Sequence, residues 1–176
     1  MSKFLSFLWC LVLVVTAAAG EYQREDWPHW KDLDRDCQNT RAEMLIRDSL
    51  SPVRFKSTWG CRVVSGEWRC PYTGRIYLMA SDIDIDHMVP LANAHRSGGA
   101  QWSRAQRKAF ANDPDNLFCV EDNTNQSKSD KGPEEWRPPL KSFWPEYARH
   151  WIYIKKKYGL RFSKEEREAL KEMLSL

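Results

Sequence analysis

The sequence predicts an α+β fold in a single domain, because helix-start signals and short strand-like stretches alternate over 176 residues. Three Ser/Thr-x-x-Glu/Gln segments, beginning at Thr40, Ser103 and Ser163, have the pattern of capping boxes that open helices. Hydrophobic residues make up 42% of the chain and nine are Trp, which excludes a disordered tail. The net charge of +3 does not identify a nucleic-acid partner.

Residues 1–19 have the pattern of a secretory signal peptide. Lys3 precedes an apolar run from Phe4 to Val15, and small residues follow up to Ala19. The run is shorter than the ~20 apolar residues that span a bilayer. We therefore expect cleavage after Ala19, no membrane anchor, and a secreted or periplasmic protein.

Removal of the leader leaves four cysteines, Cys37, Cys61, Cys70 and Cys119. An even number in an oxidising compartment predicts two disulfides, for which three pairings are possible. A hairpin that turns at 65–66 would place Cys61 opposite Cys70. The residues alone leave the pairing open.

The elements expected in the first half are mostly short. They are a helix over 40–49, strands at 53–55, 62–64 and 67–69, and a turn at 71–74. Residues 81–90 alternate, so a strand there places Ile83 and Ile85 on one face and three aspartates on the other. The aspartate face, formed by Asp82, Asp84 and Asp86, is too acidic to be core.

The second half is predicted to be mainly helical. We expect a helix over 103–111, a buried strand at 117–120, a short polar helix at 123–128, a long helix at 142–158 and a last helix from Ser163. The long helix carries Tyr147, Trp151, Ile154 and Tyr158 at helical spacing, a stripe typical of core.

Several polar residues stand at the ends of these predicted elements. Asp86 and His87 end a strand, Asn116 begins the next, and Asn125 and Lys128 lie one turn apart on the polar helix. These segments, Asp-Ile-Asp-His-Met-Val-Pro-Leu, Asp-Asn-Leu and Asn-Gln-Ser-Lys, resemble the HNH endonucleases, which share a ββα-metal finger. They look most similar to the secreted branch grouped as a domain of unknown function related to the GmrSD nucleases.

The resemblance covers about 37–160 and includes the segments 39–41, 71–74 and 136–139. It implies a finger over about 81–129, embedded in a small disulfide-stapled domain with flanking helices. It also implies metal-dependent cleavage of DNA, or alternatively RNA. Because no helix with base-reading side chains is recognisable, we expect little sequence specificity. We also expect a monomer.

Phosphodiester hydrolysis needs a base for the attacking water and a cation for the charge on the phosphate. His87 is the candidate general base, since neutral imidazole accepts a proton near neutral pH. Asp86 and Asn125 offer hard oxygen ligands that suit one Mg²⁺ or Mn²⁺ ion. The resemblance makes Asn116 the residue that ties the finger together and orients the His87 ring. Lys128 would meet a phosphate as a third catalytic residue.

Weaker candidates surround this set. Asp84 and His95 are predicted to support the site, and Arg96, Arg104 and Lys108 are candidate phosphate contacts, although a solvated helix face is the more common explanation for such basic residues. A further group has the spacing of an EF-hand calcium loop and consists of Asp32, Asp34, Asp36 and Glu43. There, Cys37 replaces the usual Gly and a capping box already explains Glu43. By the resemblance Cys37 pairs with Cys61, which leaves Cys70 for Cys119.

The alternative function is a secreted binding module, for example for cell-wall glycan, that keeps the finger only as a scaffold. The nine Trp and six Tyr motivate it. Such aromatic richness is more typical of a core, and a scaffold would not need His87 and Asn125.

Overall fold

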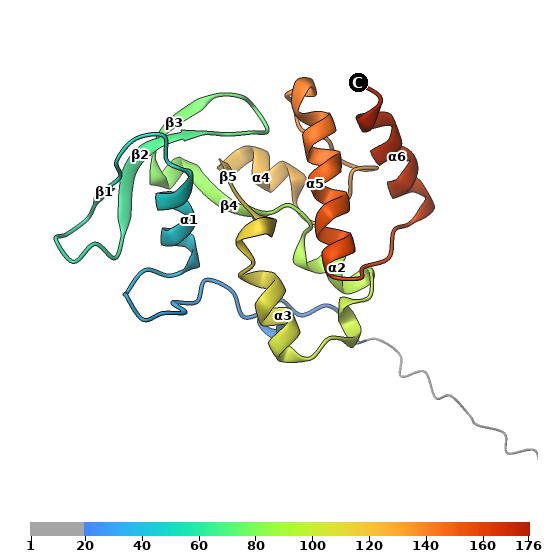
Figure 1. Cartoon of the computed structure of the whole chain (residues 1–176), viewed down its shortest axis with the longest axis horizontal. Coiled ribbons are helices and arrows are strands. Elements are labelled where there is room, and N and C mark those ends of the chain that lie inside the picture. The colour runs from blue at the N-terminus through green and yellow to red at the C-terminus, as the bar shows by residue number, and fades with distance from the viewer. Residues whose placement is uncertain (1–19) are drawn as a thin grey trace, which may run out of the picture.

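The computed structural model describes residues 20–176 (Figure 1). The predicted signal peptide at 1–19 lies outside the described residues. Within 20–176, none of the helices combines the length and the apolar character that crossing a membrane requires.

Helices and two small antiparallel sheets make up the fold, which confirms the α+β class. The helices are α1 (Thr40–Asp48), α2 (Leu91–Arg96), α3 (Arg104–Ala111), α4 (Asp122–Lys128), α5 (Trp144–Lys157) and α6 (Lys164–Leu174). The strands are β1 (Arg54–Phe55), β2 (Val63–Arg69), β3 (Ile76–Met79), β4 (Ile83–His87) and β5 (Leu117–Glu121). One sheet has the order β1-β2-β3, and the other pairs β4 with β5.

The strands β4 and β5 and the helix α4 form a ββα unit. The strands pair antiparallel from Ile83 opposite Glu121 to His87 opposite Leu117. The helix α4 follows β5 without a loop, because the Glu121 carboxylate caps it by accepting from the backbone N–H groups of Asn123 and Thr124. The unit therefore lies within the predicted finger, while α2 and α3 occupy the long connection between its strands (Figure 1).

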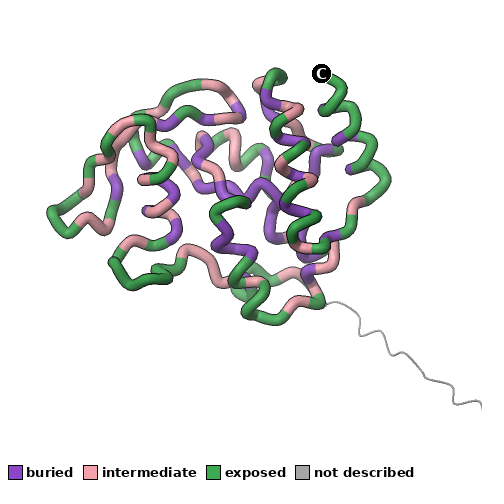
Figure 2. Tube along the Cα trace, in the orientation of Figure 1, coloured by how far each residue is buried: buried purple, intermediate pink, exposed green. Residues whose placement is uncertain are grey.

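Most residues of β4 and β5 are buried (Figure 2). Ile83 and Ile85 belong to a cluster with Trp68, and Val120 to a larger one with Tyr147. The predicted aromatic stripe of α5 lies in this larger cluster, as expected. The expectation that the aspartate face of β4 lies outside the core is wrong for one residue, since the Asp86 side chain is buried.

Two of the three predicted capping boxes are present. Those of α3 and α6, at Ser103 and Ser163, are complete. The third is wrong, because α1 is capped by the Asn39 side chain, which accepts from the backbone N–H of Ala42. The hydroxyl of Thr40 donates instead to the carbonyl of Lys31, 2.8 Å away.

The predicted hairpin at 65–66 is wrong, because β2 continues through Gly66, with a shift of register against β3 between Ser65 and Trp68. A Cβ at Gly66 would lie 2.7 Å from Ser49 Oγ and 2.8 Å from the Trp68 ring, so the glycine permits close packing. Besides β1, β2 pairs with β3, a strand that was not predicted from the sequence. The helix α2 was also not predicted. Cys61 and Cys70 consequently lie at opposite ends of one strand.

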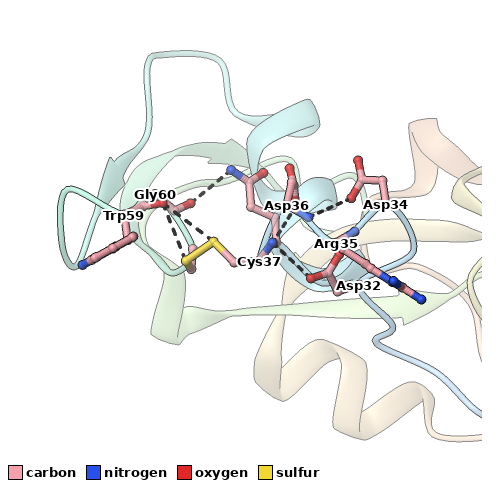
Figure 3. Close-up of a disulfide and its surroundings, with 9 residues drawn as sticks. Asp32, Asp34, Arg35, Asp36, Cys37, Trp59 and Gly60 are labelled. Carbon is pink, nitrogen blue, oxygen red and sulfur yellow. Dashed lines mark hydrogen bonds between the residues drawn. A yellow bond between two sulfur atoms is a disulfide. The ribbon is translucent and has the colours of Figure 1, made fainter.

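Cys37 and Cys61 form the predicted disulfide (Figure 3). The predicted bond between Cys70 and Cys119 is wrong, since both are buried free thiols. They belong to different clusters: Cys70 packs with Tyr72, whereas the thiol of Cys119 donates to the carbonyl of Met44. The β4–β5 strand pair separates these clusters, since it contributes Ile83 to one and Val120 to the other.

Candidate active site

His87, the last residue of β4, has its ring fixed on two sides. Its Nε2 lies 2.9 Å from the carbonyl oxygen of Ala111 at the end of α3. The Trp30 ring stacks on it with 5.7 Å between centroids and an interplanar angle of 29°. A carbonyl oxygen only accepts, so Nε2 carries the proton and Nδ1 keeps a lone pair. Nδ1 has no hydrogen-bond partner among the described residues, and His87 lines a cleft.

Burial keeps this imidazole neutral. Removal from water disfavours the charged ring and, with smaller effects from nearby cations such as Arg24 and Lys128, lowers the pKa of His87 to about 3. The ring is therefore an unprotonated base throughout the neutral range.

Asn116 fixes the backbone that follows His87. Its side chain, which is 0% exposed, accepts from the N–H of Val89 at 2.9 Å and donates to the carbonyl of Val89 at 3.1 Å. Its own carbonyl accepts from the N–H of Met88. Asn116 thus joins the end of β4 to the start of β5, in keeping with its predicted tying role, while Ala111 and Trp30 contact the ring itself.

The carboxylate of Asp86 is buried and held at both oxygens. The Tyr72 hydroxyl donates to Oδ2 at 2.6 Å, and the ammonium of Lys128 donates to Oδ1 at 2.9 Å. Burial raises the pKa of Asp86, and the Lys128 charge and the Tyr72 hydroxyl counteract this rise. Each oxygen still has a second lone pair.

The structure does not place Lys128 where it would meet a phosphate. The side chain is 0% exposed, and its ammonium also donates to the backbone carbonyl of His87 at 2.9 Å. The i+3 spacing correctly predicted that Asn125 and Lys128 share one face of α4, but that face packs on β4. In this structure Lys128 positions Asp86.

Asn125 faces the same strand. Its Nδ2 donates to Oδ2 of Asp84 at 3.1 Å, so the helix spacing from Asn125 to Lys128 matches the strand spacing from Asp84 to Asp86. This hydrogen bond uses the amide nitrogen of Asn125 and leaves its oxygen without a protein donor among the described residues. Burial, and next the proximity of Asp122, raises the pKa of Asp84.

The predicted metal ligands and base line one cleft of about 510 Å³. Its walls are formed by Tyr22, Arg24, Ile85, Asp86, His87, Pro90, Leu91, Ala92, Asn125, Gln126, Ser129 and Asp130. A carboxylate, an amide oxygen and an imidazole therefore share a solvent-filled space. Carboxylate and amide oxygens fit a hard divalent cation such as Mg²⁺ or Mn²⁺, and no thiol lines the cleft.

The comparisons with known proteins identify a family and a relative. The family model for the C-terminal domain of the GmrSD restriction endonucleases matches residues 39–173. The chain belongs to this family. An uncharacterized secreted protein of Arthroderma benhamiae is 46% identical over 156 residues, which cover 88% of this chain and 74% of the relative. No solved structure matches.

The GmrSD-family match includes the whole ββα unit but begins after the segment that supplies Tyr22 and Arg24 to the cleft. Sequence reasoning missed both residues. Neither lies in a motif, and residues 20–30 carry no regular element except a short 3₁₀ turn, Arg24–Asp26. The packing of this segment against α2 and α3 brings it to the cleft.

The weaker candidates lie around the cleft of this GmrSD-family domain. His95 binds the Gly20 carbonyl through Nε2 at 2.8 Å and lines a neighbouring hollow. Arg96 pairs with Asp130 at 2.5 Å. The exposed side chains of Arg104 and Lys108, on α3, do not line the cleft. Their predicted phosphate contacts gain no support from this placement.

The acidic loop of the GmrSD-family chain lies beside the disulfide (Figure 3). One carboxylate oxygen from each of Asp32, Asp34 and Asp36 lies within 4.8 Å of the others. Burial, and then these three charges, raises the pKa of Glu43, which makes no capping box. Three of the four residues predicted to bind Ca²⁺ thus lie close together and have suitable oxygen donors, whereas Glu43 is not part of this group. They form no part of the His87 cleft.

Proposed function

We propose that this chain is a secreted, metal-dependent endonuclease that acts as a monomer on DNA, or alternatively RNA, with little sequence specificity. The observation that carries the proposal is the free lone pair of His87 Nδ1 in a cleft shared with Asp86 and Asn125. Two comparisons support it: the family is a domain of restriction endonucleases, and a relative is described as secreted. Export is consistent with a leader at 1–19.

His87 would take the proton of the attacking water at Nδ1. A proton transfer of this kind requires a neutral ring, and burial keeps the ring neutral by lowering the pKa of His87. As Nδ1 gains the proton, the positive charge spreads over the ring, and the Nε2–H bond to the Ala111 carbonyl strengthens. Trp30 restrains the ring plane during this transfer.

Asp86 and Asn125 would hold Mg²⁺ or Mn²⁺. When bound, such an ion supplies positive charge to the scissile phosphate and the leaving oxygen. The amide of Asn125 is oriented by its hydrogen bond to Asp84, which leaves the amide oxygen as the donor for a cation. Tyr72 and Lys128 fix the carboxylate of Asp86 beside it. Residues outside the cleft thus orient the ligands within it.

The aromatic residues give little support to the alternative glycan-binding function. Trp27, Trp68 and Trp151 are fully buried, and among the tryptophans within 20–176 only Trp59 is classed as exposed, at 84%. A single exposed ring beside the disulfide does not form a platform for a sugar chain (Figure 3).

The test is cleavage of supercoiled plasmid and of a structured RNA by the purified protein with Mg²⁺ or Mn²⁺. We expect EDTA to abolish cleavage and His87→Ala to lower its rate about 100-fold or more. The matched control is His150→Ala, because His150 lies outside the cleft. Cleavage that survives both EDTA and His87→Ala would contradict the mechanism. Saturable glycan binding with both nucleic acids left intact would favour the alternative.

A further inference from the structure

The N-terminal arm, residues 20–30, is packed onto the domain beside the candidate active site. The carbonyl of Gly20 accepts from His95 Nε2 of α2, and the Tyr22 ring packs edge-on against the same imidazole with 5.7 Å between centroids. Trp27 is 0% exposed and contacts Phe110 of α3. The arm is therefore part of the folded structure, and two anchors hold the backbone between them in place.

Between these anchors the arm presents Arg24 to the cleft that contains His87. The Arg24 side chain is exposed and makes no salt bridge with any residue of the described range. An arginine held near a base, but without a carboxylate partner, is available to a ligand.

The other charges of the cleft are already compensated. Asp86 is paired with the buried Lys128, and Asp130 with Arg96. Apart from the neutral imidazole of His87, Arg24 is the one basic side chain among the residues that line the cleft. An anion that approaches His87 therefore meets a single unpaired cation, at the arm.

We propose that Arg24 is a catalytic residue that binds a non-bridging oxygen of the scissile phosphate, so that the N-terminal arm completes the active site. This inference rests on the proposed nuclease function and adds a substrate contact to it. A guanidinium offers two parallel N–H donors that match two phosphate oxygens. Because the family match begins at residue 39, the contact belongs to a part of the chain that precedes the family domain.

The arm also contributes to the base itself. Its last residue, Trp30, is the ring that stacks on His87. One short segment thus touches the imidazole and presents the cation. In this arrangement the general base and the phosphate contact are positioned by the same piece of backbone, and a shift of the arm would affect both.

The test compares Arg24→Ala and Arg24→Lys in the full chain, with Arg54→Ala as the matched control. Arg54 is also an exposed arginine without a salt bridge, but it lies on β1, away from the cleft. We expect Arg24→Ala to lower kcat/KM for plasmid cleavage about 10-fold or more, at an unchanged melting temperature. Arg24→Lys should restore part of the loss, since an ammonium supplies charge without the paired donors. The control should cut like the unmodified protein.

A binding measurement separates failure of this inference from failure of the nuclease function. Anisotropy of a fluorescent oligonucleotide is followed with His87→Ala, which we expect to cut about 100-fold more slowly or less, and with His87→Ala carrying Arg24→Ala. We expect the second variant to bind about 10-fold more weakly and with a shallower salt dependence. If the unmodified protein cuts nucleic acid, but Arg24→Ala changes neither the rate of cleavage nor the binding of the oligonucleotide, the inference is wrong. If the unmodified protein neither cuts nor binds nucleic acid, the nuclease function is wrong and the inference falls with it.

Discussion

The ammonium of Lys128 lies 2.9 Å from Oδ1 of Asp86, and both side chains are buried where α4 packs against β4. Removal of one partner from a buried ion pair leaves an uncompensated charge, which costs about 3–5 kcal/mol. We therefore expect Lys128→Met to lower the free energy of unfolding by about this amount, as measured by urea denaturation. The exposed Lys108→Met is the control. A stable Lys128→Met protein with impaired cleavage would instead favour the phosphate contact predicted from the sequence.

Two buried tyrosines should respond differently to loss of the hydroxyl. Tyr72 donates to Asp86, whereas the hydroxyl of Tyr147 has no hydrogen-bond partner within residues 20–176. Tyr72→Phe should destabilise the protein by about 1–3 kcal/mol, because an acceptor on Asp86 is left unsatisfied. Tyr147→Phe should leave stability unchanged or raise it. Calorimetry of the two variants checks the difference, and equal losses would show that the Tyr72 hydrogen bond contributes nothing specific.

The buried His87 should make the protein sensitive to mild acid. The pKa of His87 falls from 6.5 to about 3 on folding. At a pH between these two values, the imidazole is protonated in the unfolded chain but neutral in the folded chain. Stability is complete above pH 6.5 and decreases as pH falls towards 3. We expect a loss of about 2 kcal/mol between pH 7 and pH 5 through this side chain. Urea denaturation at both pH values should show a smaller loss of stability for His87→Gln than for the unmodified protein. Equal losses would show that His87 is not the group responsible for the acid sensitivity.

The disulfide should stabilise the protein by restricting the unfolded chain. Cys37 and Cys61 are separated by 24 residues, and closing a loop of that size contributes about 3 kcal/mol. The double variant Cys37→Ser/Cys61→Ser should lose about this amount in urea denaturation. A reducing agent should lower the stability of the unmodified protein equally and leave the double variant unchanged. A reductant effect on the double variant would have to come from another source.

The sequence predicted those features that depend on local signals. The capping boxes at Ser103 and Ser163 involve residues three apart, so they are visible in a short window. Gly66 was misinterpreted because a glycine serves equally in a turn and in a tight packing contact, and only the nearby Trp68 distinguishes them. The face of Lys128 was predictable from helical spacing, but its burial depends on the distant strand β4.

The same distinction explains which parts of the candidate site were found. His87 and Asn116 stand in recognisable short motifs, and the structure ties the segments that contain them together. Arg24 has no motif, and its position depends on long-range anchors at Gly20 and Trp27. The role of Ala111 was equally invisible, because it acts through its backbone carbonyl and any residue type supplies one.

The paired spacing of α4 and β4 restricts how this domain can vary in length. Asn125 and Lys128 meet Asp84 and Asp86 only while the helix starts at its present distance from β5. Deletion of a single residue between β5 and Asn125 would turn both side chains by about 100° around the helix axis. Insertions or deletions at this point should therefore be tolerated far less than amino-acid replacements on the exposed side of the helix.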